Sequence, residues 1–190
     1  MSKRRVFSLI VSVSIIIAAF VTSLWAQQSP ELAAESEAYC ASTASTKATP
    51  QMIMEKVNQG CTLLGTEGKA AFPRFMGKGS QFLFAGTYLW IHDLKGKMLM
   101  HPIKHTMVGN ELMGLKDNTG KRFFVTMNQI AEEKGEGWVG YVWPKPGEKN
   151  LYPKVSFVKK CKMAGGEEVI VGCGAFDLQD ELKKQGIEVR

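Results

Sequence analysis

Two segments near the start of the chain have the hydrophobic spacing of helices. Residues 31–45 begin with ELAAESEAYCA, which is rich in alanine and glutamate, both good helix formers. Thr49 and Pro50 then predict a second helix start, because proline fits the first helical position. Apolar side chains follow at intervals of three or four residues, at Ile53, Val57, Cys61 and Leu64. We therefore predict a second helix that buries this stripe and ends at Gly65 or Gly68.

The pattern changes at Gln81, where aromatic and aliphatic residues follow one another without a helical period. Residues 88–92 predict a strand, DLKG a tight turn, and residues 97–101 the returning strand. Pro102 has no N–H to donate, so the pairing is expected to end there.

The second half of the chain alternates between helical and extended patterns. Apolar positions share one helical face between residues 123 and 131, and Gly135 predicts the end of that helix. Three strands are predicted next, at 138–144, 155–163 and 168–173, followed by a short helix in DLQDELKKQG. Adjacent strands are joined as hairpins except across the middle helix. The order predicts an α+β fold, with one mostly antiparallel five-stranded sheet covered by helices.

The first 26 residues have the pattern of a secretory signal peptide. Three basic residues, Lys3 to Arg5, precede an uncharged run over 6–25, and Ala26 offers a small residue for cleavage. The apolar run is also long enough to span a bilayer, so an uncleaved N-terminal anchor is the alternative. Positive residues stay inside the cytoplasm, so either interpretation places the remainder in the periplasm or outside the cell.

Charge argues against nucleic-acid binding by the remainder. The 24 Lys and Arg residues include three in the N-terminal segment, so without it the formal charge falls from +6 to +3. No cluster of basic residues with interleaved aromatics is found. We expect no nucleic-acid partner.

Four cysteines in an exported chain suggest disulfides, and three connectivities are possible. Cys161 and Cys173 flank a predicted hairpin and could face each other across its strands, which would leave Cys40 to pair with Cys61. The alternative for Cys61 is a buried free thiol on the apolar helix face. The predicted disulfide is Cys161 with Cys173.

Residues 97–107, KMLMHPIKHTM, carry soft and borderline metal ligands at Met98, Met100, His101, His105 and Met107. In a regular strand Met98 and Met100 share one face and His101 points to the other. Pro102 interrupts the strand before His105, so the ligands converge only if a loop folds back. A periplasmic copper-binding protein that uses this cluster is therefore kept as the alternative function. In the preferred interpretation, we expect no metal and no other cofactor.

Catalytic motifs are absent from the sequence. The chain has no G-x-S-x-G, no H-E-x-x-H and no C-x-x-C. No set of base, nucleophile and oxyanion donor can be assembled, so we predict that the protein is not an enzyme.

Pairs of side chains two residues apart suggest a small-ligand pocket on the sheet. Tyr88 with Trp90, Tyr141 with Trp143, and Lys154 with Ser156 each share one face of their predicted strand. If these faces coincide, one wall carries aromatic rings, a cation and a hydroxyl group, as in many ligand sites. The alternative is that the aromatic residues are ordinary core.

Four joined motifs carry a resemblance to a known family. They are Y-x-W-x-x-D-x-x-G from Tyr88, M-x-M-H-P from Met98, L-K-D-x-x-G-K from Leu115 and Y-x-W-P-K-P-G from Tyr141. Over residues 50–177 the chain resembles the single Cache domains, which are extracytoplasmic sensor domains with a PAS-like fold. The resemblance implies an N-terminal helix over 27–48, the Cache domain over 49–180 and a C-terminal tail over 181–190.

The resemblance also implies a function and a site. Family members bind small organic molecules, often short carboxylates or amino acids, and commonly belong to chemoreceptors, histidine kinases or cyclases. Carried to this chain, it places Tyr88, Trp90, His101, Tyr141, Trp143 and Lys154 near the pocket. A buried Lys154 or a positioned His101 would favour a small, anionic organic ligand. The sequence shows no second apolar run and no signalling domain, so we expect a separate membrane kinase or chemoreceptor as partner, with a solute scavenger as the alternative. Dimerisation through the first helix is left open.

Overall fold

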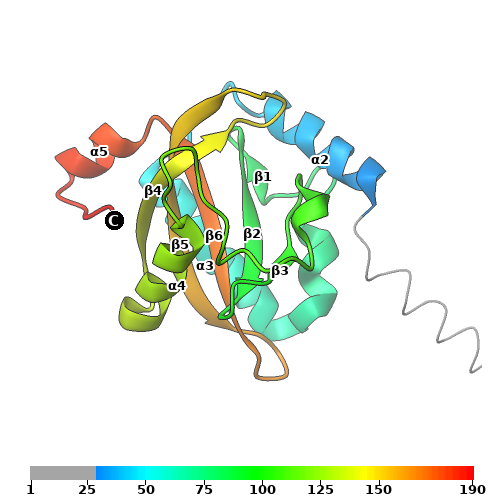
Figure 1. Ribbon diagram of the computed structural model, residues 1–190. Coiled ribbons are helices and arrows are strands. Elements are labelled where there is room, and N and C mark those ends of the chain that lie inside the picture. Colours follow the sequence, from blue (N-terminus) through cyan, green and yellow to red (C-terminus); the bar gives the residue numbers. More distant parts are fainter. Residues whose placement is uncertain (1–28) are drawn as a thin grey trace, which may run out of the picture.

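The computed structural model describes residues 29–190 (Figure 1). The predicted signal peptide or anchor over 1–26 lies outside the described residues. Between residues 29 and 190, no helix has both the length and the apolar character needed to cross a membrane.

One antiparallel sheet forms the centre of the molecule, as predicted. Its strands follow the spatial order β1-β2-β6-β5-β4, and β3 pairs with β2 beside this path. The sheet has six strands, not five, because a two-residue strand that the sequence pattern did not indicate pairs with β2. The strands are β1 (Leu83–Phe84), β2 (Thr87–Asp93), β3 (Met98–Met100), β4 (Glu136–Pro144), β5 (Leu151–Lys162) and β6 (Glu168–Phe176).

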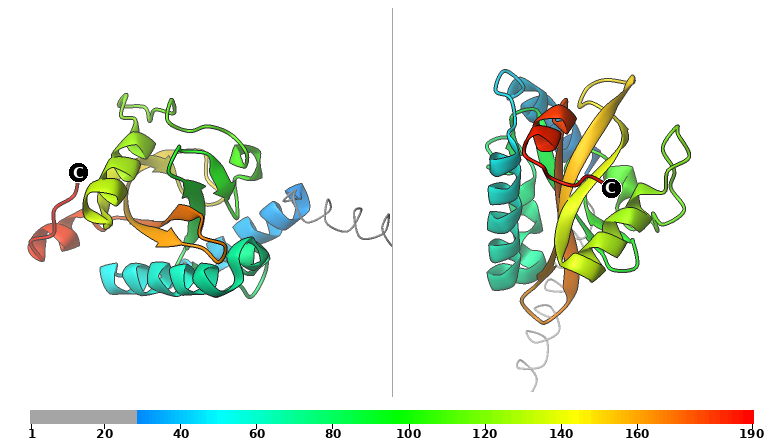
Figure 2. Two further views of the ribbon diagram at one scale, coloured as in Figure 1. Left: turned by 90° about the horizontal axis from the view of Figure 1, so that it is seen from below. Right: turned by 90° about the vertical axis from the view of Figure 1, so that its left-hand side faces the viewer.

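Helices lie on both faces of the sheet (Figure 2). The helices are α2 (Pro30–Ser42), α3 (Pro50–Glu67), α4 (Phe123–Lys134) and α5 (Gln179–Lys184), with 3₁₀ turns at η1 (Gly68–Phe75) and η2 (His105–Met107). The predicted N-cap of α3 is confirmed, because the Thr49 side chain accepts a hydrogen bond from the Met52 N–H and Pro50 follows it. In one view of Figure 2 the sheet is seen edge-on, with α3 on one side and α4 on the other.

Strand alternation divides the core between these two faces. On the α3 face, Leu89, Ile91 and Phe157 pack against the predicted helix stripe, including Ile53 and Val57. On the α4 face, the buried side chains are more aromatic and belong to a second cluster, which includes Tyr88, Trp90, Phe123, Phe124, Met127, Val139, Tyr141 and Val158. The fold is thus a three-layer arrangement with one sheet between two different cores.

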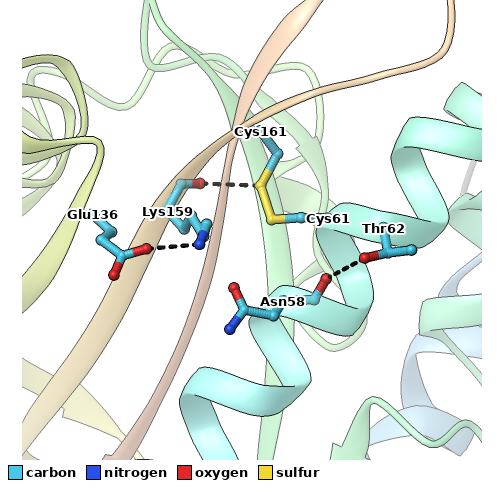
Figure 3. The surroundings of a disulfide bond; sticks show 6 residues. All are labelled: Asn58, Cys61, Thr62, Glu136, Lys159 and Cys161. Atoms are coloured by element: carbon cyan, nitrogen blue, oxygen red, sulfur yellow. Dashed lines mark hydrogen bonds and ion pairs between the residues drawn. A yellow bond between two sulfur atoms is a disulfide. The ribbon is translucent and has the colours of Figure 1, made fainter.

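The predicted disulfide between Cys161 and Cys173 is wrong. Cys161 bonds to Cys61, which joins β5 to α3 with a Cα–Cα distance of 5.5 Å (Figure 3). In the β5–β6 ladder Cys161 lies opposite Val169, whereas Cys173 lies opposite Phe157, so the two cysteines do not face each other. Cys161 instead points toward the α3 stripe that contains Cys61. Cys40 and Cys173 are buried free thiols.

The C-terminal residues return to the edge of the sheet. The Gly140 N–H donates to the Arg190 carbonyl at 2.9 Å, and the Arg190 N–H donates to the Trp138 carbonyl at 3.0 Å. These bonds satisfy backbone groups on the outer edge of β4. Figure 1 shows the C-terminus beside this strand.

Candidate functional site

The ladder registers bring the predicted site residues to the α4 face of the sheet. Tyr141 on β4 lies directly opposite Lys154 on β5, and Lys154 lies opposite Phe176 on β6. On the far side of β6, Gly172 lies opposite Trp90 of β2. Because alternate residues share a face, Tyr88 and Trp143 belong to this same surface.

Two glycines in β6 make room for these side chains. A Cβ atom at Gly172 would lie 2.3 Å from Cζ2 of Trp90. A Cβ atom at Gly174 would lie 1.9 Å from Oγ of Ser156. Sequence reasoning missed these positions, although a glycine within a strand often marks a close approach of another group. The alternation of glycine in VIVGCGAF was the signal that could have found them.

Lys154 is a buried cation surrounded by aromatic rings. Its side chain is 1% exposed, and Nζ lies 4.4 Å from the ring centroid of Tyr88, 5.5 Å from that of Trp90 and 5.3 Å from that of Phe176. Within residues 29–190 the structure records no hydrogen bond and no ion pair for this ammonium group. Burial lowers the pKa of Lys154 from 10.5 to about 8.

His101 is held as a neutral ring by hydrogen bonds from the backbone. Its Nδ1 accepts hydrogen bonds from the backbone N–H groups of Ile103 at 3.3 Å and Lys104 at 2.9 Å, so the proton of the neutral ring lies on Nε2. The imidazole lies 4.9 Å from the Tyr88 ring. Burial, followed by the charges of Lys154 and Lys104, lowers the pKa of His101 from 6.5 to about 3.

Hydroxyl and indole groups add further donors. Nε1 of Trp143 donates to the Tyr88 hydroxyl at 3.2 Å, and the hydroxyls of Tyr141 and Ser156 are 2.9 Å apart. Nε1 of Trp90 is buried and has no hydrogen-bond partner among the described residues. Burial raises the pKa of Tyr88 and of Tyr141, so both phenols keep their protons at neutral pH.

A small cavity lies among these side chains. It has a volume of about 10 Å³, room for about one water molecule. Five of the six predicted site residues line it: Tyr88, Trp90, His101, Tyr141 and Trp143. The lining also includes three residues that were not predicted to belong to the site: Met107, Phe123 and Phe124. Lys154 is absent from this lining. The protein's own rings fill most of the predicted pocket, so any larger guest requires a side chain to move.

Two of the missed residues come from the first turn of α4. Phe123 stacks on Tyr141 with ring centroids 4.4 Å apart, and Phe124 lies beside His92 with its ring at 87° to the imidazole. The apolar stripe of this helix was visible in the sequence. Its position above Tyr141 depends on how the helix docks on the sheet.

The predicted sharing of one face by Met98 and Met100 is wrong. Met98 pairs with His92 and Met100 pairs with Ile91, and the register shifts between them. His92 and Ile91 are consecutive, so the two methionines point to opposite faces. Nδ1 of His101 is occupied by backbone N–H groups. Among the described residues, no group of three His, Cys, Asp or Glu side chains could hold a metal ion.

Comparison with known proteins identifies similar sequences and folds. Residues 41–186 match the family described as Single Cache domain 2. Methyl-accepting chemotaxis protein McpP of Pseudomonas putida is 35% identical over 100 residues, which are 52% of this chain and 18% of that protein. The chain therefore spans less than a fifth of the length of this relative.

Solved structures include further sensor domains. A Cache chemosensory domain studied for carboxylic acid recognition is 35% identical, with 48% of this chain and 60% of that chain covered and a TM-score of 0.44. A methyl-accepting chemotaxis protein from Vibrio parahaemolyticus is 22% identical, with 70% and 87% covered and a TM-score of 0.53. The second likeness concerns the fold, and agrees with the predicted PAS-like architecture.

Proposed function

This chain belongs to the single Cache domain family, as its motifs predicted, and on that premise we propose that it is an extracytoplasmic sensor domain for a small carboxylic acid. The family supports a ligand-sensing role in signal transduction. The observation that carries the choice of ligand is the ammonium group of Lys154, which is buried without a counter-ion among the described residues and lies 5.5 Å from the ring of Trp90, whose Nε1 has no acceptor there. We propose a binding role and not a catalytic one.

A carboxylate complements this set of groups. A buried charge is costly unless it is paired and hydrogen-bonded. Lys154 offers three N–H donors, Trp90 Nε1 and His101 Nε2 each offer one, and an ionised carboxylate is purely an acceptor. Binding of a carboxylate would therefore satisfy an unpaired charge and the unpaired indole N–H of Trp90 together, which favours an anion over a neutral or cationic ligand.

The site favours a simple monocarboxylate over an amino acid. Lys154 is the one buried lysine in the part of the chain that the structure describes, so it matches one carboxylate group. None of the residues that line the cavity is acidic, so no carboxylate is present to pair with a ligand ammonium group. The small cavity favours a ligand of few carbon atoms.

Location and partner follow from the family and the N-terminal pattern. We propose that residues 1–26 direct the domain across the cytoplasmic membrane. We further propose that the ligand signal passes to a separate membrane protein, such as a histidine kinase or a chemoreceptor.

Thermal unfolding and calorimetric titration test the ligand class. Acetate and propionate are expected to bind and to raise the unfolding temperature, because a ligand of the native state stabilises it by about 2.7 kcal/mol at 100 times its dissociation constant. Glycine, alanine and succinate are expected to bind more weakly. Failure of every monocarboxylate to bind or to stabilise the wild-type protein would reject the proposal.

Two variants assign the binding to the buried cation. Lys154→Met should abolish monocarboxylate binding, because it keeps the length of the side chain and removes its charge and donors. Lys116→Met is the matched control, since Lys116 is exposed and lies outside the site. Unchanged affinity in a folded Lys154→Met protein would contradict the proposed role.

A further inference from the structure

Phe176 lines an open groove, and its ring centroid lies 5.3 Å from Nζ of the buried Lys154. The groove has a volume of about 570 Å³ and is formed by the end of α2, the turn between β1 and β2, the turn between β4 and β5, and the end of β6. Figure 1 shows the β4–β5 turn beside α2, where the Gly147 N–H donates to the Glu37 carboxylate at 3.0 Å. Side chains of the groove include Ala44, Ser45, Lys47, Lys145, Phe176 and Asp177.

The Phe176 ring lies close to two lysine side chains. Nζ of Lys145 lies 5.5 Å from the centroid of its ring, and Nζ of Lys154 lies 5.3 Å from the same centroid. Lys145 lines the groove, whereas Lys154 is buried. The half-buried Phe176 ring therefore belongs both to the groove lining and to the surroundings of the buried ammonium group.

The backbone next to Phe176 is under strain. Asp177 has φ of 61° and Ala85 has φ of 48°, and these are the two residues other than glycine with positive φ in the described part of the chain. Both line the groove. Such conformations cost of order 1–3 kcal/mol and often occur where a segment must switch or clamp a ligand.

A weak ion pair holds this strained segment in place. Nζ of Lys145 lies 3.7 Å from Oδ2 of Asp177, whose side chain is 73% exposed. Exposed pairs of this kind contribute little to stability. Among these contacts, movement of the segment that carries Phe176 and Asp177 would therefore break one weak ion pair.

The aromatic cavity offers a more obstructed route to Lys154. The rings of Tyr88 and Trp90 cover the ammonium group on that side. The cavity holds about one water molecule, and Phe123 stacks on Tyr141 beside it.

We propose that this groove is the entrance for the anionic ligand and that Phe176 is the gate between the groove and Lys154. A small carboxylate first docks beside Lys145, competes with Asp177 for that cation, and reaches Lys154 when the Phe176 ring moves. The inference rests on the proposed function for its ligand, but the gate can be tested without any ligand.

Reductive methylation with formaldehyde and cyanoborohydride reports access to Lys154, because its neutral amine is the reactive form and the reagents are small. The extent of methylation is read by mass spectrometry, with exposed Lys116 as the internal reference. Phe176→Ala should raise the methylation rate of Lys154 by about tenfold, as expected when a local closed state that limits access is removed. Met107→Ala, which opens the cavity side, should leave the rate unchanged.

Two further variants keep this test decisive. If Phe176→Ala does not fold, Phe176→Leu replaces it, since the smaller side chain also removes the ring. Ser45→Trp changes an exposed groove residue and should slow the methylation of Lys154 in an otherwise wild-type protein. A faster reaction in Met107→Ala, or no change in either Phe176 variant, would overturn the proposed gate.

Stopped-flow measurement of Trp fluorescence with propionate then tests the entrance for the ligand itself. A gate alters passage in both directions, so Phe176→Leu should raise the association and dissociation rates together by a similar factor, with little change in Kd. If propionate fails to bind the wild-type protein, the proposed function fails, while the methylation experiment still decides the gate. If propionate binds and both rates are unchanged in Phe176→Leu, the gate is rejected and the proposed function stands.

Discussion

The two faces of the central sheet are built from the same strands but have different properties. The α3 face buries aliphatic side chains against the helix stripe and is joined to that helix by the Cys61–Cys161 disulfide. The α4 face buries Lys154, His92 and His101 together with most of the aromatic rings around the small cavity. Neighbouring residues of one strand, such as Leu89 and Trp90, therefore serve different cores.

This difference separates stability from recognition. Apolar burial and a covalent link stabilise the α3 face, and its core cluster contains no charged side chain among the described residues. The α4 face instead carries the cost of a buried cation and an unpaired indole N–H, which a suitable ligand would offset. We expect perturbations of the first face to change mainly the free energy of unfolding, and perturbations of the second to change both stability and binding.

Removal of the disulfide should have the largest effect on the α3 face. The bond closes a loop with a sequence separation of 100 residues. The double variant Cys61→Ser with Cys161→Ser should lose about 2–5 kcal/mol of unfolding free energy, because the unfolded chain gains conformational freedom. Denaturant unfolding measures the loss, and propionate should still bind the protein that remains folded. Dithiothreitol should destabilise the wild-type protein and leave the double variant unchanged; equal responses would contradict this bond.

Neutralising Lys154 should stabilise the α4 face while binding is lost. Lowering the pKa of Lys154 from 10.5 to about 8 means that burial of its charged form costs about 3 kcal/mol of folding free energy. Lys154→Met removes this cost but also loses the cation–π contacts with the rings. The variant should therefore gain about 2 kcal/mol of unfolding free energy at pH 7. Between pH 8 and 10.5 the unfolded state binds more protons at Lys154 than the folded state, so wild-type stability rises relative to the variant.

The comparison with Lys154→Met isolates this titration from its neighbours. Cys40, Cys173 and Tyr88 interact with the same region, and burial raises the pKa of each, so they lower stability at high pH in both proteins. The gain of the variant should therefore disappear by pH 10.5. A gain that persists there would show that Lys154 is not the titrating group.

Adding one methyl group at Gly172 should disturb the α4 face specifically. The new Cβ would overlap Trp90, so Gly172→Ala should cost about 1–3 kcal/mol and weaken propionate binding by displacing the indole. Gly114→Ala is the control, since a Cβ atom at Gly114 would have no other group within 4 Å. Thermal unfolding and calorimetric titration measure both effects, and unchanged binding in Gly172→Ala would show that the indole position does not matter.

Acid should destabilise the α4 face through His92, with the smallest of these effects. Nε2 of His92 lies 3.0 Å from Oδ1 of Asn128, and burial lowers the pKa of His92 from 6.5 to about 4. At His92 the unfolded state therefore binds more protons between pH 6.5 and 4, and this group alone lowers stability by about 1 kcal/mol from pH 7 to 5.5, beside a separate contribution of the same sign from His101. His92→Gln should lack this component in denaturant titrations at the two pH values; an unchanged slope would contradict it.

Periodicity was enough to predict most of the local structure. The stripe that contains Ile53 and Val57 predicted α3, and the strand patterns predicted both the antiparallel sheet and the sharing of a face by Tyr88 with Trp90. These predictions succeed because side-chain direction in a helix or strand depends on local backbone geometry.

Irregular or distant features escaped the same reasoning. The register shift beside Met98 reversed the face of one methionine, and the pairing of Cys161 depended on a helix 100 residues earlier in the chain. The groove lined by Phe176 is formed by four separate segments of the chain, so the pattern of no single segment could predict it.

The sequence by itself determined the family, the element order and the residue types of the candidate site, because motifs and periodicity are properties of consecutive residues. Only the tertiary structure decided that Lys154 is buried without a counter-ion among the described residues, that Cys61 is the partner of Cys161, and that the ring near Lys154 also lines an open groove. Burial, pairing and access depend on which distant side chains occupy the surrounding space, and that is set by the docking of helices on the sheet.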